Sequence, residues 1–409
     1  MSEKFIMSGY KIINSIEEAD ICIVNTCSVT NVSDRKSRQI IRKVKEKNPK
    51  AIIIVTGCYA QVAKDVLKEM PEVNLVIGNN EKKDIIQYVE KFIQENQKQI
   101  IDVKDVFEPK EFADFGTITY TEKTRAAIKV QDGCDRFCSY CIIPYARGRV
   151  RSRKPESIIK EIKEVTKKGI KEVVITGIHI ASYGKDFKET YTLIDLLEQI
   201  NQIEGIKRIR LGSIEPTLIT EEFISRLINL EKICHHFHLS LQSGCDETLK
   251  RMNRRYTVQE FKEVVNRLRK TYTDVILTTD IIVGFPGETQ EEFEKTYTFL
   301  KDINFYKMHI FPYSARKGTK ASEMENQIDS QEKEKRSKIL IELSNKNQLE
   351  YNKNYLGKTV EVLIEEDLKG HTSNYMLVKA LDETINLENQ ILKLKIVEAK
   401  TEFLEGKLM

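Results

Sequence analysis

The chain has 409 residues, of which 40% are hydrophobic and 31% charged, a balance that excludes disordered and fibrous proteins. The formal charge is 66 − 62 = +4, which permits an anionic partner without requiring one. The N-terminal segment lacks the apolar core of a signal peptide, and the apolar run 51–55 is too short to cross a bilayer. Eight cysteines without a secretory signal indicate a reducing compartment, so we expect a cytoplasmic protein that is not bound to membranes.

The N-terminal region predicts a parallel α/β domain over residues 1–105. Apolar runs predict buried strands at 19–24, 51–55 and 73–77, and a basic stretch over 35–47 predicts a helix between the first two. Strand, helix and strand at this spacing form a βαβ unit. We place the boundary of this domain in the segments 91–98 and 109–115.

The central region, 120–350, predicts a partial (β/α)6 barrel. Strands are expected at 126–130, 172–175, 208–211, 236–241, 275–283 and 305–311. Helices are expected between them at 155–168, 191–203, 220–230, 257–272 and 290–302. Six repeats of 30–45 residues give a parallel sheet that is smaller than the usual eight-stranded barrel. Glycine-rich and polar motifs follow each strand, and this is where such folds carry their chemistry.

A charged helix over 330–352 leads into a third region at 351–409. Expected strands at 359–365, 375–379 and 390–397 predict a small antiparallel β-domain of the barrel type.

The most informative motif is Cys134, Cys138 and Cys141 in a C-x3-C-x2-C spacing. Thiolates this close select zinc, copper(I) or an iron–sulfur cluster. A structural zinc site needs four closed ligands, whereas three thiolates on a four-iron cluster leave one iron open for a small molecule. The alternative is a zinc knuckle or chance core cysteines.

Cys27 and Cys58 form a second group. Each follows an apolar run, so both are expected at the carboxyl ends of adjacent parallel strands, about 4.8 Å apart, where they could face one ligand. Taken alone, two buried structural cysteines would be the better interpretation. Cys22, Cys234 and Cys245 lack ligand spacing and are expected to pack in the core.

Basic runs are the remaining signal. They comprise Arg147, Arg149, Arg151, Arg153 and Lys154; Lys250, Arg251, Arg254 and Arg255; and Arg35, Lys36, Arg38, Arg42 and Lys43. Such runs are usually solvated faces, but the first two adjoin the expected active mouth and could hold RNA phosphates. His235, His236 and His238 are interpreted as barrel interior rather than metal ligands.

GCDRFCSYC and IIPYARGRVRSR resemble the signature of radical S-adenosylmethionine (SAM) enzymes. GSIEP, LQSGCDETLKRMNRRYT, TDIIVGFPGET and FPYSARKGT resemble later blocks of the methylthiotransferase branch, and NTCSVTNVSDRKSRQIIR and VTGCYAQ resemble its N-terminal domain. The C-terminal β-region resembles the RNA-binding TRAM domain of that branch. The combination is most similar to the enzymes that methylthiolate threonylcarbamoyladenosine beside the tRNA anticodon.

This resemblance implies that Cys134, Cys138 and Cys141 bind a [4Fe-4S] cluster whose open iron chelates SAM, and that a protein donor supplies the reducing electron. A methylthio group would be added to carbon 2 of the adenine in the tRNA anticodon loop. Gly177, Glu215, Ser243 and Asp280, near strand ends, are candidate contacts to SAM. Each of these four could instead be a loop or barrel-filling residue.

The resemblance also implies that Cys27 and Cys58 ligate an auxiliary [4Fe-4S] cluster. Relatives begin with a further strand that supplies a third cysteine, whereas this sequence starts at MSEKFIMSGYKI, which resembles the helix after that strand. A labile second cluster is therefore expected. Two alternatives remain: a sister enzyme that methylthiolates a ribosomal protein, and a non-catalytic iron–sulfur or RNA-binding paralogue.

Overall fold

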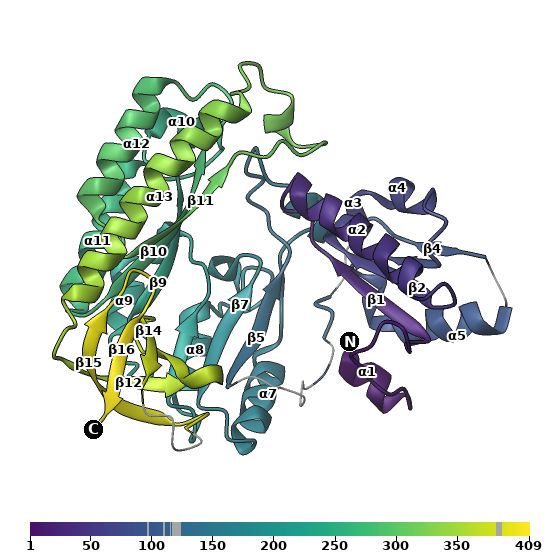
Figure 1. Cartoon of the computed structure of the whole chain (residues 1–409), viewed down its shortest axis with the longest axis horizontal. Helices are drawn as coiled ribbons and strands as arrows, with labels where there is room; N and C mark the ends of the chain where they lie inside the picture. Colours follow the sequence, from purple (N-terminus) through teal and green to yellow (C-terminus); the bar gives the residue numbers. More distant parts are fainter. Residues whose placement is uncertain (96–97, 109–110, 115, 117–123, 382–386) are drawn as a thin grey trace. The chain divides into compact units, whose positions relative to one another are not determined.

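The computed structural model describes residues 1–95, 98–108, 111–114, 116, 124–381 and 387–409 (Figure 1). By internal contacts the chain forms two compact units. Unit 1 comprises Met1–Tyr120, Asp132–Ser152 and Ser314–Glu323, and unit 2 comprises Thr121–Gln131, Arg153–Tyr313 and Met324–Met409. The expected boundary segments at 91–98 and 109–115 fall partly outside the described residues, as does residue 120. The three domain ranges stay a prediction.

Unit 1 is built on a parallel sheet with helices on both faces. Its strands, in spatial order, are β1 (Ile21–Thr26), β2 (Ile52–Gly57), β3 (Leu75–Ile77) and β4 (Ile100–Asp102). Its helices are α1 (Ser2–Met7), α2 (Asn31–Lys47), α3 (Cys58–Val62), α4 (Lys64–Lys68), η1 (Glu81–Asp84), α5 (Ile85–Glu95), α6 (Ile143–Arg147) and η4 (Lys320–Ser322). The expected βαβ unit is confirmed, because β1 and β2 pair in parallel on either side of α2 in the chain.

Burial on two faces explains why β2 is apolar along its length. Ile53 and Val55 pack in one cluster with Ile41 of α2, while Ile54 packs on the other face with Ile85 of α5. A strand covered on both sides has no solvent-facing positions, so its sequence does not alternate.

Unit 2 contains the expected repeats of strand and helix. Its strands are β5 (Arg125–Asp132, the last residue of which belongs to unit 1), β7 (Glu172–Gly177), β8 (Arg208–Leu211), β9 (His236–Gln242), β10 (Ile276–Val283) and β11 (Lys307–Pro312). β5, β7 and β8 pair in parallel, as do β9, β10 and β11. Single bridges, Ile209 to Ile233 and Ile214 to Leu239, join the two sheets. This arrangement confirms the partial parallel barrel predicted from the sequence.

Helices cover the outer side of this wall of strands, and Figure 1 shows α11, α12 and α13 along β9–β11. They are α7 (Pro155–Lys167), η2 (Ile180–Ser182), α8 (Leu193–Asn201), η3 (Pro216–Leu218), α9 (Glu221–Leu227), α10 (Asp246–Arg251), α11 (Val258–Thr271), α12 (Gln290–Ile303) and α13 (Ser330–Lys353). Capping boxes at Thr192, Thr257 and Thr289 begin α8, α11 and α12, and thereby satisfy backbone N–H groups at the helix starts.

The C-terminal strands close into a small barrel, which confirms the predicted β-domain. In order around the barrel they are β12 (Thr359–Ile364), β13 (Lys369–Thr372), β14 (Leu377–Ala380), β16 (Leu404–Leu408) and β15 (Ile391–Ala399), with η5 (Glu366–Leu368) between β12 and β13. The pairs are antiparallel except β14 with β16, which is parallel. In the described part of the chain, no helix is both long and apolar enough to cross a membrane.

Candidate functional site

The three grouped cysteines lie in unit 1 on the loop between β5 and α6, followed by the short strand β6 (Arg151–Ser152). The N–H of Cys134 donates to the carbonyl oxygen of Gly148 at 3.0 Å, and the N–H of Cys141 donates to the carbonyl oxygen of Cys138 at 2.9 Å. Gly133 has φ +72°, and a Cβ there would lie 1.8 Å from the carbonyl oxygen of Arg149. The loop therefore requires glycine at this position and is fixed by its own backbone.

Aromatic side chains pack around Phe137, the residue before the second cysteine of the loop. Phe137 has φ +48°, an unusual conformation for a bulky residue. Its ring lies 6.4 Å from that of Phe107 and 5.8 Å from that of Tyr145, and the Arg149 guanidinium sits 5.3 Å from its centroid. These contacts hold the strained backbone that turns the chain between Cys134 and Cys138.

The cysteine loop fits a multi-iron cluster better than a single ion. Each of the three cysteines is half-buried, and none of the eight cysteines of the chain, all described, forms a disulfide. Three thiols on one loop can each bind a separate iron of a cluster and leave a fourth iron open, whereas a structural zinc site needs four closed ligands.

Cys27 and Cys58 lie side by side at the carboxyl edge of the unit 1 sheet. Thr26 and Gly57 are paired across β1 and β2, so the next residue of each strand is one of these cysteines. Gly57 has φ +104°, and a Cβ there would lie 2.2 Å from the carbonyl oxygen of Thr26. Cys27 is exposed and Cys58 is buried. This juxtaposition agrees with the expectation that both thiols can face one ligand.

Arg147 joins this pair from α6. Its Nε donates to Sγ of Cys58 at 3.2 Å, and its Nη1 lies 3.6 Å from Oδ2 of Asp132. Burial alone lowers the pKa of the Arg147 guanidinium, but Asp132, Cys58 and Cys27 together raise it above its usual value. Arg147 thereby places a positive charge beside the two sulfurs, where it would balance the negative charge of a thiolate-bound metal group.

Of the other cysteines, Cys234 and Cys245 are buried, as expected, and Cys22 is partly buried against the core of unit 1. Burial raises the pKa of the Cys234 thiol to about 11 and also raises that of Cys22. Such thiols are poor metal ligands and poor nucleophiles at neutral pH.

In unit 2, the predicted residue Glu215 lies at the centre of a charged group at the strand ends. Its Oε2 is 3.0 Å from Nε2 of His179, which follows β7, and its Oε1 is 3.6 Å from Nη2 of Arg254. Thr217 donates to the same carboxylate at 3.4 Å. Glu215 is only 4% exposed, so its charge depends on these partners.

Gly177 belongs with the Glu215 group. It ends β7, and a Cβ there would lie 2.9 Å from the carbonyl oxygen of Gln131. Oε1 of the same glutamine accepts the backbone N–H of His179 at 2.7 Å. The close approach of β5 and β7 thereby places His179 against Glu215.

The contacts of Ser243 and Asp280 are with other residues than those of the Glu215 group. Ser243 is buried, and its Oγ is 3.3 Å from Oγ1 of Thr296 on α12. Asp280 lies on β10, with its Oδ2 3.2 Å from Nε2 of His238 on β9. Gly177 and Glu215 share the contacts made by Gln131 and His179, and which of the four residues bind SAM stays a prediction.

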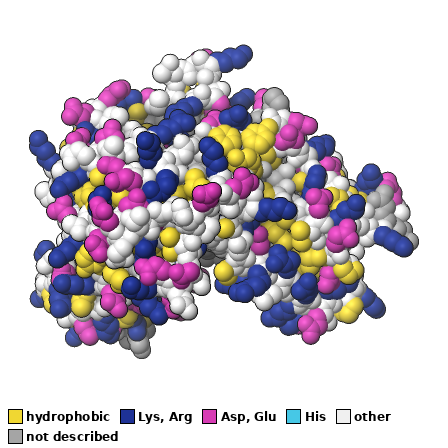
Figure 2. Space-filling model, turned by 90° about the horizontal axis from the view of Figure 1, so that it is seen from above, with side chains coloured by type: hydrophobic (Ala, Val, Ile, Leu, Met, Phe, Trp, Pro, Cys, Tyr) yellow, Lys and Arg dark blue, Asp and Glu magenta, His cyan; other side chains and the backbone are white. Residues whose placement is uncertain are grey.

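The interpretation of the basic runs as a phosphate-binding surface is corrected in part. Within unit 1, Arg151 is buried and donates to Asn80. Within unit 2, Arg153 is buried against Glu161, Arg251 pairs with Glu292, and Arg254 is committed to Glu215. The exposed members are Arg149, Lys154, Lys250 and Arg255, and on α2 Arg35, Lys36, Arg42 and Lys43. Figure 2 shows blue and magenta side chains interspersed on one face, not a continuous basic patch.

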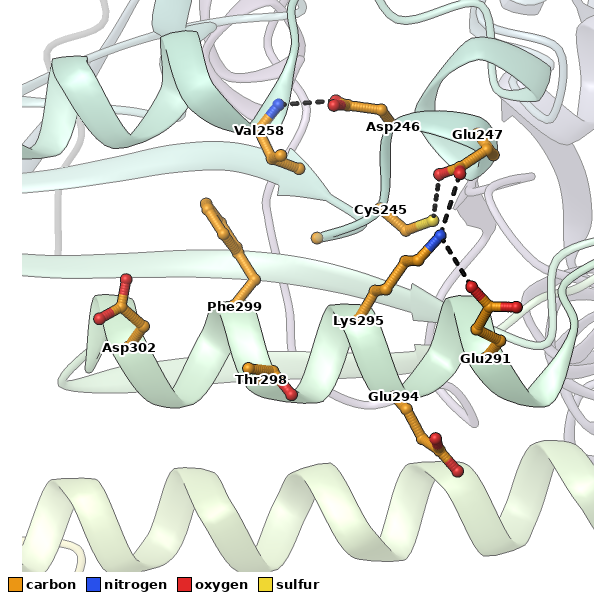
Figure 3. Close-up of a pocket in the computed structure, with 11 residues that line it drawn as sticks. Cys245, Asp246, Glu247, Val258, Glu291, Glu294, Lys295, Thr298, Phe299 and Asp302 are labelled. Atoms are coloured by element: carbon orange, nitrogen blue, oxygen red, sulfur yellow. Dashed lines mark hydrogen bonds and ion pairs between the residues drawn. The ribbon is translucent and has the colours of Figure 1, made fainter.

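A cavity of about 830 Å³ in unit 2 lies between α10 and α12 and does not coincide with these groups (Figure 3). Lys295 pairs there with Glu247 at 3.1 Å and Glu291 at 3.2 Å. The Cys245 thiol donates to Glu247, and burial followed by this contact raises its pKa. Lys295 therefore balances two of the acidic side chains of this cavity, and the neutral form of the Cys245 thiol is favoured.

The sequence did not predict that Arg147 contacts Cys58, or that His179 and Arg254 contact Glu215. Another such contact is made by Arg316 in unit 1, which donates to Ser28 at 2.7 Å. Each of these arginines, like His179, belongs to a motif of the sequence, namely IIPYARGR, TGIHIASYG, LKRMNRRYT or SARKGT. The motif gave the position, but nothing in the sequence gave the partner.

Comparison with known proteins identifies the family. Residues 128–300 match the model of the Radical SAM superfamily, and residues 1–78 match that of the Uncharacterized protein family UPF0004. Thus both the grouped cysteines and the Cys27–Cys58 pair fall within matched segments.

Curated relatives match nearly the whole chain. The threonylcarbamoyladenosine tRNA methylthiotransferase MtaB of Bacillus subtilis (strain 168) is 40% identical, over 99% of this chain and 91% of its own length. MtaB of Aquifex aeolicus (strain VF5) is 42% identical, over 93% of this chain and 92% of its own. The tRNA-2-methylthio-N(6)-dimethylallyladenosine synthase of Clostridium tetani (strain Massachusetts / E88) is 37% identical, over 97% and 90%.

Among solved structures, the radical SAM methyltransferase TsrM from Kitasatospora setae, with cobalamin and a [4Fe-4S] cluster bound, has a similar fold. The TM-score is 0.56 at 16% identity, over 75% of this chain and 67% of that one. With matches of this identity and coverage among the curated relatives, the chain belongs to the radical SAM methylthiotransferase family.

Proposed function

We propose that this protein transfers a methylthio group to carbon 2 of N6-threonylcarbamoyladenosine beside the tRNA anticodon. The observation that carries the proposal is identity of 40% and 42% to two MtaB enzymes over nearly the full chain. The dimethylallyladenosine synthases are 36–38% identical, so transfer to that base is the second candidate.

Cys134, Cys138 and Cys141 would hold a [4Fe-4S] cluster, with its fourth iron open to SAM. When reduced by a partner protein, this group supplies the electron that cleaves SAM homolytically. The backbone of the loop, fixed at Gly133, would hold the three cysteines in place, and the packing of Phe137 against Phe107 and Tyr145 supports the same loop.

Glu215 would orient SAM at the strand ends of unit 2. Since His179 and Arg254 hold this carboxylate, the Oε atoms are presented in one orientation. Gly177 would allow the ligand to approach the β7 backbone closely. Ser243 and Asp280 stay weaker proposals, because their described contacts are with Thr296 and His238.

An auxiliary cluster that carries the inserted sulfur is proposed at Cys27 and Cys58. Adjacent strand ends supply the two thiols, and Arg147 supplies a compensating positive charge. This cluster would also need ligands beyond these two thiols. The C-terminal barrel, 351–409, is proposed to contact the tRNA.

Mass spectrometry of tRNA nucleosides tests the proposal. Cells that lack the chain should lose 2-methylthio-threonylcarbamoyladenosine, wild-type protein should restore it, and Cys138→Ala should not. Restoration of the 2-methylthio-dimethylallyl nucleoside instead would establish the second candidate. Modification of a ribosomal protein alone, or no modification at all, would overturn the tRNA assignment.

A further inference from the structure

Three ligand-type side chains converge on the inner wall of the unit 2 barrel, and no function above uses them as a group. They are His238 on β9, Asp280 on β10 and His309 on β11. One ligand atom of each lies within 4.8 Å of the other two. From its sequence, His238 was interpreted as a barrel-interior residue rather than a metal ligand. The position of Asp280 and His309 next to it, which the sequence does not show, is the reason to revise the second part of that interpretation.

Strand register explains the convergence. His238 is paired with Thr278, and His309 is paired with Asp280, on either side of β10. Thr278 and Asp280 are two residues apart on one strand, so all these side chains point to the same face of the sheet. The alternate residues Leu277 and Ile281 pack in the core under the helices. The group is therefore on the face opposite that core.

The contacts within the group are those of a metal site. Nε2 of His238 lies 3.2 Å from Oδ2 of Asp280, close to the separation of about 3.0–3.4 Å between two ligands of one ion bound at 2.0–2.1 Å. The other ring nitrogen, Nδ1, is 2.9 Å from Oγ1 of Thr278. Such a hydrogen bond fixes the orientation of a histidine whose second nitrogen binds metal. The rings of His238 and His309 are 5.8 Å apart by centroid, and one ligand atom of each of the three residues lies within 4.8 Å of the other two.

Next to the His238, Asp280 and His309 group, polar and aromatic contacts hold the neighbouring residues of β9 and β10 in place. His236 is buried, and its Nε2 is 2.9 Å from Oγ1 of Thr278. Its ring stacks on Tyr375 at 4.4 Å, and Tyr375 stacks on His371 at 4.7 Å. Thr278 is therefore shared between His236 and His238, which restricts the rotation of both rings. His309, on the edge strand of its sheet, is the exposed member and gives an ion a route of entry.

We propose that His238, Asp280 and His309 bind a divalent transition-metal ion such as Zn²⁺ inside the barrel of unit 2. Two imidazoles and one carboxylate are a ligand set that suits such ions and leaves coordination positions open. An ion held there would present those positions to the barrel interior, where it could orient an oxygen ligand.

Metal content and X-ray absorption at the zinc edge test this site in the full chain with its iron–sulfur content reconstituted. After incubation with Zn²⁺ and desalting, we expect one zinc per chain, with nitrogen and oxygen neighbours at about 2.0–2.1 Å. Zinc held by cysteines would show sulfur at about 2.3 Å instead. This readout needs no turnover, so it is independent of the proposed tRNA activity.

Three variants make the assignment specific. His309→Ala and Asp280→Asn should each lower zinc retention by about tenfold or more. His235→Ala is the matched control, because His235 lies next to β9 and pairs with Asp274 at 2.6 Å outside the group; it should retain zinc. His309→Cys should keep zinc and add one sulfur neighbour. Iron content and circular dichroism report whether each variant folds.

Three results would overturn the site: no zinc retained by the wild-type chain, a zinc edge with sulfur neighbours alone, or equal retention by His309→Ala, Asp280→Asn and wild type.

Discussion

The two units position their polar residues in different ways. In unit 1 the cysteines lie on short segments after strands, and backbone contacts at Gly57 and Gly133 fix them. In unit 2 the side chains fix one another, as Glu215 does with His179 and Arg254. The comparison indicates that the two cysteine groups of unit 1 are completed by the inorganic groups they bind, whereas the Glu215 group of unit 2 is held in place by its own side chains. Substitutions should therefore remove function outright in unit 1 and weaken it by degrees in unit 2.

The largest effect is expected at the cysteine loop. Cys138→Ala should lower production of 5′-deoxyadenosine from SAM by more than about a hundredfold, beyond the 10–100-fold typical of residues that only support a metal ligand. The assay is chromatography of the reaction under reducing, oxygen-free conditions. Cys22→Ala, at a core cysteine of the same unit, is the control and should keep most of the activity. Undiminished SAM cleavage in Cys138→Ala would show that this thiol is not a ligand.

A substitution at the other thiol pair should separate two steps of the reaction. Cys58→Ser should leave SAM cleavage within a few-fold of wild type, because the SAM-binding cluster is assigned to a different loop. The methylthio product should fall to background, since serine is a poor ligand for iron. Both quantities can be measured in one assay with tRNA. Equal loss of cleavage and product would contradict the division of labour between the two cysteine groups.

In unit 2 the expected effect is smaller. Glu215→Gln keeps the shape of the side chain but removes the charge that His179 and Arg254 hold, so the KM for SAM should rise by about 10–100-fold. Thr217→Val, at a residue that donates to the same carboxylate over 3.4 Å, should change it much less. A drop in kcat without a change in KM would place Glu215 outside the SAM site.

Strands and helices were predictable wherever a long apolar period or a full set of repeats was present. The strand β4 (Ile100–Asp102) was missed, because three residues give no period and its pairing with β3 is made by distant sequence. In the C-terminal barrel, β13 (Lys369–Thr372) and β16 (Leu404–Leu408) were not predicted, because each is a short run without a clear apolar period, and the parallel pair β14–β16 was missed with them.

The site was predictable only as far as residue chemistry and spacing define it. Three cysteines within eight residues of sequence, 134–141, indicate a metal group whatever the fold. The arginine run at 147–153 was interpreted as a phosphate surface, yet Arg151 and Arg153 are buried. A run of basic residues does not indicate which acidic or amide groups of other segments it will contact in the folded chain, such as Asn80 and Glu161 here. Partners that meet through tertiary structure had to come from the structure.

The smallest expected effect concerns the alkaline stability of unit 2. Cys234 is buried, and burial raises the pKa of its thiol from 9.0 to about 11. As pH rises, the thiol loses its proton in the unfolded chain before it does so in the folded chain. The contribution of this thiol to the free energy of unfolding is therefore complete below about pH 9 and is lost as pH rises toward about 11. By linkage, this shift of about two pKa units corresponds to at most about 2–3 kcal/mol of unfolding free energy over that window.

Chemical denaturation at several pH values should show a shallower alkaline decline in the free energy of unfolding for Cys234→Ala than for the wild type. The stability of this variant at neutral pH will be lower because of the cavity. Identical declines in wild type and Cys234→Ala would mean that this thiol does not set the alkaline limit of the barrel.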